Sequence, residues 1–146
     1  MKLFKILSIC AALIVNLQAN TLTDVTAAKA LSDKAMALAG QGKLSECIDS
    51  LREVWPIPKE EIDKLSLITN RSLLEDYKPR FGDILSAEFV GSKVVGDSLI
   101  KYYYILKMER HLTRWQFVYY KPKDEWVLNY VAWDDKTELL FDLIGK

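Results

Sequence analysis

Few side chains in this sequence could carry out chemistry on their own. One histidine, His111, and two cysteines, Cys10 and Cys47, are the only residues for nitrogen and sulfur ligation or for cysteine and histidine catalysis. Zinc and other transition-metal sites need several such ligands at fixed spacing. No Gly-x-Ser-x-Gly segment marks a serine nucleophile, and the six glycines are scattered rather than gathered in a phosphate-binding loop. We therefore expect no metal, no cofactor and no catalytic residue of these kinds.

The cysteine and the histidine are not expected to act as a pair. Cys47 shares helical spacing with Leu44, Ile48 and Leu51, which places it on the apolar face of a helix. A cysteine in that position is more often a small buried hydrophobe than a reactive thiol. His111 falls between two predicted strands, so we expect it in a solvated hairpin connection.

An acid facing a phenol is the one catalytic arrangement that the composition allows. Isomerases of this type place a carboxyl group and a tyrosine in one apolar pocket. Asp134 and Asp135 are neighbours in a predicted strand and point to opposite faces, so they make a poor carboxylate pair. Asp134 is the acid that we would place at the rim of such a pocket. A stripe of tyrosines at strand spacing, however, is more typical of a core than of a catalyst.

The first half of the chain is predicted to be helical. Apolar residues at three- and four-residue spacing predict a helix over residues 28–38, with Gly40 at its end. The pattern resumes over residues 44–55 and stops at a proline. Pro58 suits the first turn of a third helix, which Asn70 to Ser72 are expected to interrupt.

The second half alternates with a period of two and is predicted to form strands. The candidates are residues 85–89, with Gly91 as a turn, then 99–110, 115–120 and 126–133, followed by a short apolar tail at 139–144. Helices followed by strands indicate an α+β fold, with N-terminal helices packed on a curved antiparallel sheet of about four strands.

Strand parity divides the aromatic residues between two faces of the predicted sheet. The inward face would be concave, and its rings are the candidate lining of a ligand pocket: Tyr102, Tyr104, Trp115 and Tyr119. The outward face is charged but carries interrupting apolar residues, namely Tyr103, Ile105, Val118 and Tyr120. Exposed apolar patches mark interfaces, so we consider a homodimer through this outer face.

The first 19 residues read as a secretory signal peptide. Lys2 and Lys5 precede an apolar run from Ile6 to Val15, and Ala19 provides a small residue before a cut that would leave Asn20 first. The chain then has two parts, 1–19 as the signal and 20–146 as a single domain exported to the periplasm or secreted. Without the two lysines the 20 basic residues fall to 18 against 20 acidic ones. That balance favours neither nucleic acid nor membrane as a partner after signal cleavage.

The strand region also resembles a known group of proteins. Its order of turn and aromatic segments is similar to that of small secreted bacterial proteins of uncharacterised role with an NTF2-like, or cystatin-like, fold. The segments are Arg80-Phe81-Gly82, Gly96-Asp97-Ser98-Leu99, Arg114-Trp115-Gln116-Phe117, Tyr119-Tyr120-Lys121-Pro122, Trp126-Val127-Leu128, Asp134-Asp135 and Leu140-Phe141. The resemblance implies the fold and a concave pocket, and it implies no particular activity.

Three functional hypotheses follow from these features. The first is a non-enzymatic exported domain that binds a small apolar ligand or a partner protein through the aromatic concave face. The second is a small isomerase or dehydratase with an acid and a tyrosine in its pocket. The third is an inhibitor or immunity-type protein that presents one surface to one partner. A buried acid facing a tyrosine would favour the second hypothesis over the others.

Overall fold

The computed structural model describes residues 20–144, so the predicted signal peptide lies outside the described residues. The first helix, α1 (Val25–Gly40), agrees with the predicted one. Its first turn is capped by Asp24, whose carboxylate accepts a hydrogen bond from the Ala27 backbone N–H at 2.8 Å. The chain leaves the helix through Gly42, whose φ of 77° belongs to the left-handed region that glycine adopts without strain.

The next helices differ from the predicted ones at their ends. Helix α2 (Leu44–Asp49) is shorter than expected, and the Ser50 hydroxyl donates to the Cys47 carbonyl at 2.7 Å where the helix stops. Helix α3 (Lys59–Arg71) begins after Pro58 as predicted. The expected break at Asn70 to Ser72 is wrong. The chain continues through a π-helical segment, η1 (Ser72–Tyr77), into the short helix α4 (Lys78–Phe81), and this path carries Leu73 into the core.

Four strands form one antiparallel meander in the order β1-β2-β3-β4. They are β1 (Ile84–Val95), β2 (Leu99–Met108), β3 (Leu112–Tyr120) and β4 (Val127–Asp134). The turn predicted at Gly91 is wrong, because β1 runs on through it to the turn at Gly96. The pairing of β1 with β2 shifts by one residue between Phe89 and Gly91, which is a β-bulge.

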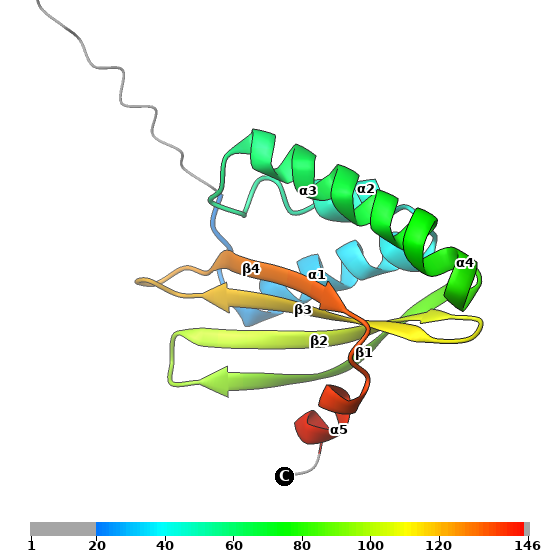
Figure 1. The fold of residues 1–146 in the computed structure, drawn as a ribbon. Helices are drawn as coiled ribbons and strands as arrows, with labels where there is room; N and C mark the ends of the chain where they lie inside the picture. The colour runs from blue at the N-terminus through cyan, green and yellow to red at the C-terminus, as the bar shows by residue number, and fades with distance from the viewer. Residues whose placement is uncertain (1–19, 145–146) are drawn as a thin grey trace, which may run out of the picture.

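The helices lie in a layer on one face of the sheet, with α1 against the strands and α2 and α3 above it (Figure 1). A last helix, α5 (Glu138–Ile144), lies on the opposite face (Figure 1). The predicted α+β class is therefore confirmed, with four antiparallel strands in an open sheet and helices N-terminal to it. No helix within residues 20–144 is long and apolar enough to cross a membrane.

The core lies between α1, α2 and the inner face of the sheet. The predicted parity of β2 and β3 is confirmed, because the residues expected to point inward are buried. Those residues are Ile100, Tyr102, Tyr104, Leu106, Met108, Trp115, Phe117 and Tyr119. Helix α1 lies close to the sheet at Gly40, where a Cβ atom would stand 2.8 Å from the Ala87 backbone nitrogen.

Candidate functional site

The four predicted pocket residues are part of the packed core. Trp115 and Tyr119 have no exposed surface, and Tyr104 and Tyr102 are 2% and 5% exposed. The tyrosine rings pack edge to face on their neighbours, with Tyr102 and Tyr119 centroids 5.9 Å apart, and Trp115 stacks on Trp133 with centroids 6.0 Å apart. Helix α1 covers the concave face over which these rings were expected to form an open pocket.

Polar atoms of the same residues bind α1 and the sheet. The Tyr102 hydroxyl donates to the Val25 carbonyl at 2.9 Å, and the Tyr119 and Ser32 hydroxyls share a hydrogen bond of 2.8 Å. The indole N–H of Trp115 donates to the Thr113 hydroxyl at 3.0 Å. Buried polar groups need such partners. The bonds of Tyr102 and Tyr119 hold α1 on the sheet, the bond of Trp115 lies within β3, and all three use donors that a ligand would need.

Tyr104 also borders an open depression. Its hydroxyl donates to the Asp33 carboxylate at 2.8 Å, and the Lys29 ammonium lies 2.5 Å from the same oxygen. The ammonium is also 4.0 Å from the centroid of the Phe89 ring. Asp33, Phe89 and Tyr104 are among the residues that line a depression of about 150 Å³ between α1 and β1. Small-molecule pockets are commonly about 300–1,000 Å³, so this one has room for a single side chain.

The Asp33–Tyr104 pair is the acid–phenol arrangement that the enzyme hypothesis requires, on a different acid from the expected one. Burial, followed by the hydrogen bond to Asp33, raises the pKa of Tyr104, so the phenol stays protonated. Its proton is directed at Asp33, and half of the Asp33 side chain is exposed beside Lys29. The Tyr104 phenol and the Lys29 ammonium are both directed at one oxygen of this carboxylate, so the phenol proton is not left free for a substrate.

The expectation that Asp134 lies at the pocket rim is wrong. Asp134 pairs with Arg114 across β4 and β3 on the outer face of the sheet, with hydrogen bonds of 2.6 and 3.1 Å. Burial would raise the pKa of Asp134, but hydrogen bonds from Arg114 and the Lys136 backbone outweigh it and hold the pKa below the usual value. Asp134 therefore forms an ion pair with Arg114 on the outer face of the sheet, away from the concave face.

The outer face is less open than the sequence suggests. Tyr103 and Val118, expected on an exposed dimer surface, are only 6% and 7% exposed, whereas Tyr120 is 42% exposed. Helix α5 lies on this face, and its Leu143 borders the same depression as Tyr103. Tyr103 and Val118 are therefore packed within the chain and do not form an exposed dimer surface.

The remaining reactive side chains are accounted for by packing. Cys47 is buried as predicted, and burial raises the pKa of its thiol to about 12. His111 lies in the β2–β3 connection, where its ring packs edge to face on Phe81 with centroids 4.3 Å apart. Within residues 20–144 no group of three or more histidine, cysteine or acidic side chains could hold a metal ion.

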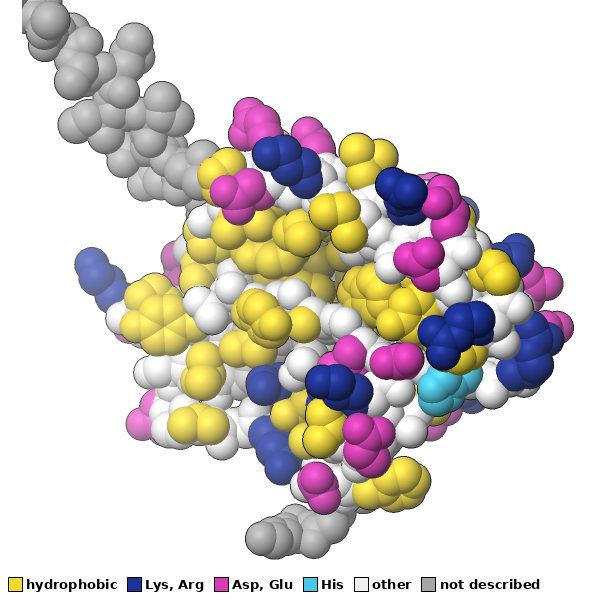
Figure 2. All heavy atoms as spheres, viewed as in Figure 1, with side chains coloured by type: hydrophobic (Ala, Val, Ile, Leu, Met, Phe, Trp, Pro, Cys, Tyr) yellow, Lys and Arg dark blue, Asp and Glu magenta, His cyan; other side chains and the backbone are white. Residues whose placement is uncertain are grey.

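Exposed apolar side chains identify two other surfaces. One is α3, where Leu65, Leu67 and Ile68 are 36%, 71% and 62% exposed. Hydrophobic side chains gather below this helix, over β4, on the face seen in Figure 2. The second surface is the β1 edge, which we define as residues 84–95. Its exposed apolar residues are Leu85, Phe89, Val94 and Val95, at 60%, 42%, 63% and 67%.

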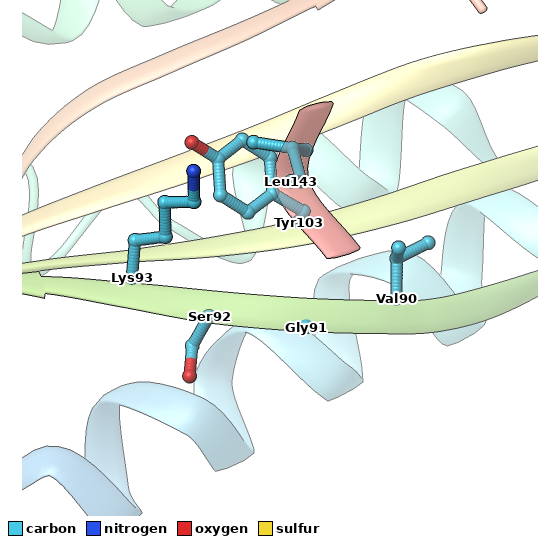
Figure 3. Close-up of a pocket in the computed structure, with 6 residues that line it drawn as sticks. All are labelled: Val90, Gly91, Ser92, Lys93, Tyr103 and Leu143. Atoms are coloured by element: carbon cyan, nitrogen blue, oxygen red, sulfur yellow. The ribbon is translucent and has the colours of Figure 1, made fainter. Parts of the chain in front are cut away.

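The β1 edge differs from α3 because it also offers backbone groups. Strand β1 is twelve residues long and comes first in the sheet order, with β2 as its only strand partner among the described residues. The Asp33–Tyr104 depression lies on its inner face. A second depression of about 110 Å³ lies on its outer face, between Gly91, Tyr103 and Leu143 (Figure 3). Val90 and Lys93 point to this outer side and Ser92 points away from it (Figure 3).

Sequence analysis missed this edge because it took Gly91 for a turn. The usable signal was the apolar pattern on both sides of that glycine, Phe89-Val90 before it and Val94-Val95 after it. Gly91 has a negative φ and open space where a Cβ atom would lie, so it serves the strand rather than a turn. A glycine within a strand pattern often marks a bulge or a close approach of another backbone.

Comparison of this chain with known protein families, with curated proteins and with solved structures finds no match.

Proposed function

We propose that this chain is an exported, non-enzymatic domain that binds an extended segment of a partner protein along the β1 edge. The observation that carries the proposal is a long strand edge with four exposed apolar side chains, no second strand partner within residues 20–144 and one depression on each face. Strand addition uses main-chain hydrogen bonds for affinity and pockets for alternate side chains for specificity. The β1 edge offers both elements.

The depressions match the spacing that an added strand requires. Successive side chains of a strand point to opposite faces, so one side chain of the bound segment would enter the Asp33–Tyr104 depression and a neighbour would enter the one beside Gly91. Phe89 would meet the first of these side chains. An apolar residue suits this position, because Met36, Phe89 and the Tyr104 ring line the depression.

Two observations support protein binding over the other functions considered. The aromatic rings expected to line a small-molecule pocket are buried in the core, and the two depressions beside the β1 edge, of about 110 and 150 Å³, are smaller than usual ligand pockets. The Tyr104 phenol donates its hydrogen bond to Asp33 of the same chain, and this disfavours an isomerase or dehydratase that would need the phenol to donate to a substrate. An inhibitor or immunity-type role is compatible with the β1 edge, since such proteins present one surface to one partner.

An NTF2-like fold and export complete the proposal. A helix along the inner face of a four-stranded meander supports the first, and the pattern of Lys2, Lys5 and the following apolar run supports the second. Expression of the full chain in a bacterium with a periplasm tests export. A product that begins at Asn20 in the periplasmic or external fraction is expected, and an uncut chain in the cytosol would contradict it.

A peptide library displayed on phage tests the binding site. The full chain is the bait, and the selected peptides are measured against variants by titration. Phe89→Lys and Val94→Asp alter exposed positions of the β1 edge, and each is expected to weaken binding by about tenfold or more. Leu67→Asp, at a position of α3 that is 71% exposed against 63% for Val94, is the control for Val94→Asp and should leave affinity unchanged.

Two results would overturn the site. Peptides that lose affinity with Leu67→Asp and keep it with the β1 variants would move the interface to α3. A library that yields no peptide dependent on Phe89 or Val94 would remove the case for strand addition. A thermal melt of each variant shows whether it is folded. Substitutions at exposed positions such as Val94 and Leu67 rarely change stability by more than about 0.5 kcal/mol, whereas Phe89→Lys also removes the ring contacts with Tyr102 and Tyr104.

A further inference from the structure

We infer that the segment which binds the β1 edge is the β1 edge of a second copy of this chain, so that two sheets join into one across a twofold axis. This inference rests on the proposed function, since it uses the same edge, and it adds the partner and the register. The register is an antiparallel pair centred between Val90 and Gly91. In it each residue from Ser86 to Val95 lies opposite a residue of the second copy.

The charges along β1 favour this register. Glu88 lies opposite Lys93 of the second copy, and Lys93 lies opposite Glu88 of the second copy, so both ion pairs form by symmetry. Within one chain, Lys93 lies across from Lys101 in the β1–β2 ladder, and like charges directly opposite are destabilising. Glu88 of the second copy would offset that repulsion. Glu88 and Lys93 are five residues apart and would face opposite sides of a regular strand. The extra residue in the bulge, Val90, places both side chains on the outer face.

The shapes at the centre of the register are also complementary. Val90 lies opposite Gly91 of the second copy, on the face that carries the depression between Gly91, Tyr103 and Leu143. A Cβ atom at Gly91 would meet nothing within 4 Å, so this space is open in one copy. Val90 from the second copy would enter it, and the reverse contact follows by symmetry.

The same register covers exposed apolar residues on both faces. On the inner face Ala87 lies opposite Val94 of the second copy, and on the outer face Ser86 lies opposite Val95 of the second copy. Val94 and Val95 are 63% and 67% exposed in the single chain. A long apolar edge left unpaired invites aggregation, and pairing with a second copy removes that hazard. The register thus satisfies charge, shape and burial with one symmetry operation.

Sedimentation of the full chain and of charge variants tests the pairing. The wild-type protein is expected to have twice the monomer mass. Glu88→Lys places two lysines opposite each other at each pair, and Lys93→Glu places two glutamates opposite each other. Each variant alone is expected to raise the dissociation constant of the dimer by about tenfold or more. Glu75→Lys, an equal charge change on η1, is the control and should leave the dimer intact.

Mixing the two single variants gives the sharper measurement. One copy then offers lysines at positions 88 and 93 and the other offers glutamates, so every pair is again of opposite sign. We expect the mixture, and also the double variant Glu88→Lys/Lys93→Glu, to recover the dimer. The loss of the Glu88–Lys107 ion pair, present within one chain at 2.9 Å, cannot explain such a recovery. Gly91→Leu should fill the depression and give a folded monomer.

Each outcome decides for or against the inference. A wild-type monomer at all accessible concentrations, or single variants that dimerise as well as wild type, would overturn it. A dimer that the mixture fails to restore would also overturn it, since the register would be different. If the chain is monomeric and displayed peptides still bind through Phe89 and Val94, only the second copy is excluded and the proposed function stands. If neither a dimer nor such peptides are found, both fail.

Discussion

Tyr104 donates a hydrogen bond from its phenol to the carboxylate of Asp33, 2.8 Å away, and thereby ties the middle of β2 to α1. The ring is buried while half of the Asp33 side chain is exposed. The bond holds α1 over the concave face of the sheet, and the depression between α1 and β1 lies beside it. The same contact therefore stabilises the helix on the sheet and shapes the inner side of the β1 edge.

Removal of this hydrogen bond should have a modest cost. Tyr104→Phe keeps the ring in the core and leaves Asp33 in contact with Lys29 and water, so the free energy of unfolding should fall by about 0.5–1.5 kcal/mol. Urea unfolding followed by fluorescence measures the difference. Tyr120→Phe, at a position 42% exposed, is the control and should change stability by less than about 0.5 kcal/mol. Equal losses in both variants would argue against the Asp33 contact.

The close approach of α1 to β1 predicts an unusual effect of alanine. Gly→Ala within a helix is ordinarily stabilising, but a Cβ at position 40 would stand 2.8 Å from the Ala87 backbone nitrogen. Strand backbone cannot yield easily, so Gly40→Ala should lower stability by about 1–3 kcal/mol. Gly91→Ala meets open space and should be nearly neutral. A stabilised Gly40→Ala in thermal melts would mean that α1 lies further from the sheet.

The Arg114–Asp134 pair predicts a specific dependence on pH. The pKa of Asp134 in the folded chain is lowered from an ordinary value of 3.8, so its contribution to stability is present above that pH and lost as the pH falls toward the folded pKa. Asp134→Asn should lower stability by about 1–3 kcal/mol near pH 7, because the Arg114 side chain is only 10% exposed. The gap between wild type and variant should then shrink as the pH falls below the ordinary pKa of 3.8 toward the lowered pKa of the folded chain.

Urea unfolding at a series of pH values measures that gap. Asp63→Asn removes a carboxylate that is 61% exposed in its contact with Arg52, and it should show a smaller gap at every pH. A gap for Asp134→Asn that stays constant into acid would show that Asp134 is not ionised through its contact with Arg114.

Burial of Cys47 predicts that its thiol is protected. Its pKa is raised to about 12, so almost none of the reactive thiolate is present at neutral pH. A chain with Cys10→Ser has Cys47 as its only thiol, and a coloured disulfide reagent should label it no faster than the protein unfolds. Rapid labelling in urea is the positive control. Rapid labelling of the native protein would place Cys47 at the surface.

Much of the fold could be predicted from residue order because its elements are periodic. Spacing of three and four residues located α1, and alternation through Leu99 to Met108 predicted which faces of β2 are buried. The predictions failed where a local signal competed with packing. Gly91 resembles a turn residue, yet the ladder with β2 continues through it, and Asn70 to Ser72 resemble a helix break, yet burial of Leu73 keeps the chain helical.

The candidate site was less predictable than the fold because it depends on which elements touch. The sequence by itself determined that Tyr102, Tyr104, Trp115 and Tyr119 share a face, since parity is a local property of a strand. Only the tertiary structure decided that α1 covers that face and that Asp33, rather than Asp134, meets a tyrosine. It also decided that β1 lies at an edge. Sheet order and helix placement arise from contacts between distant segments, which no local period encodes.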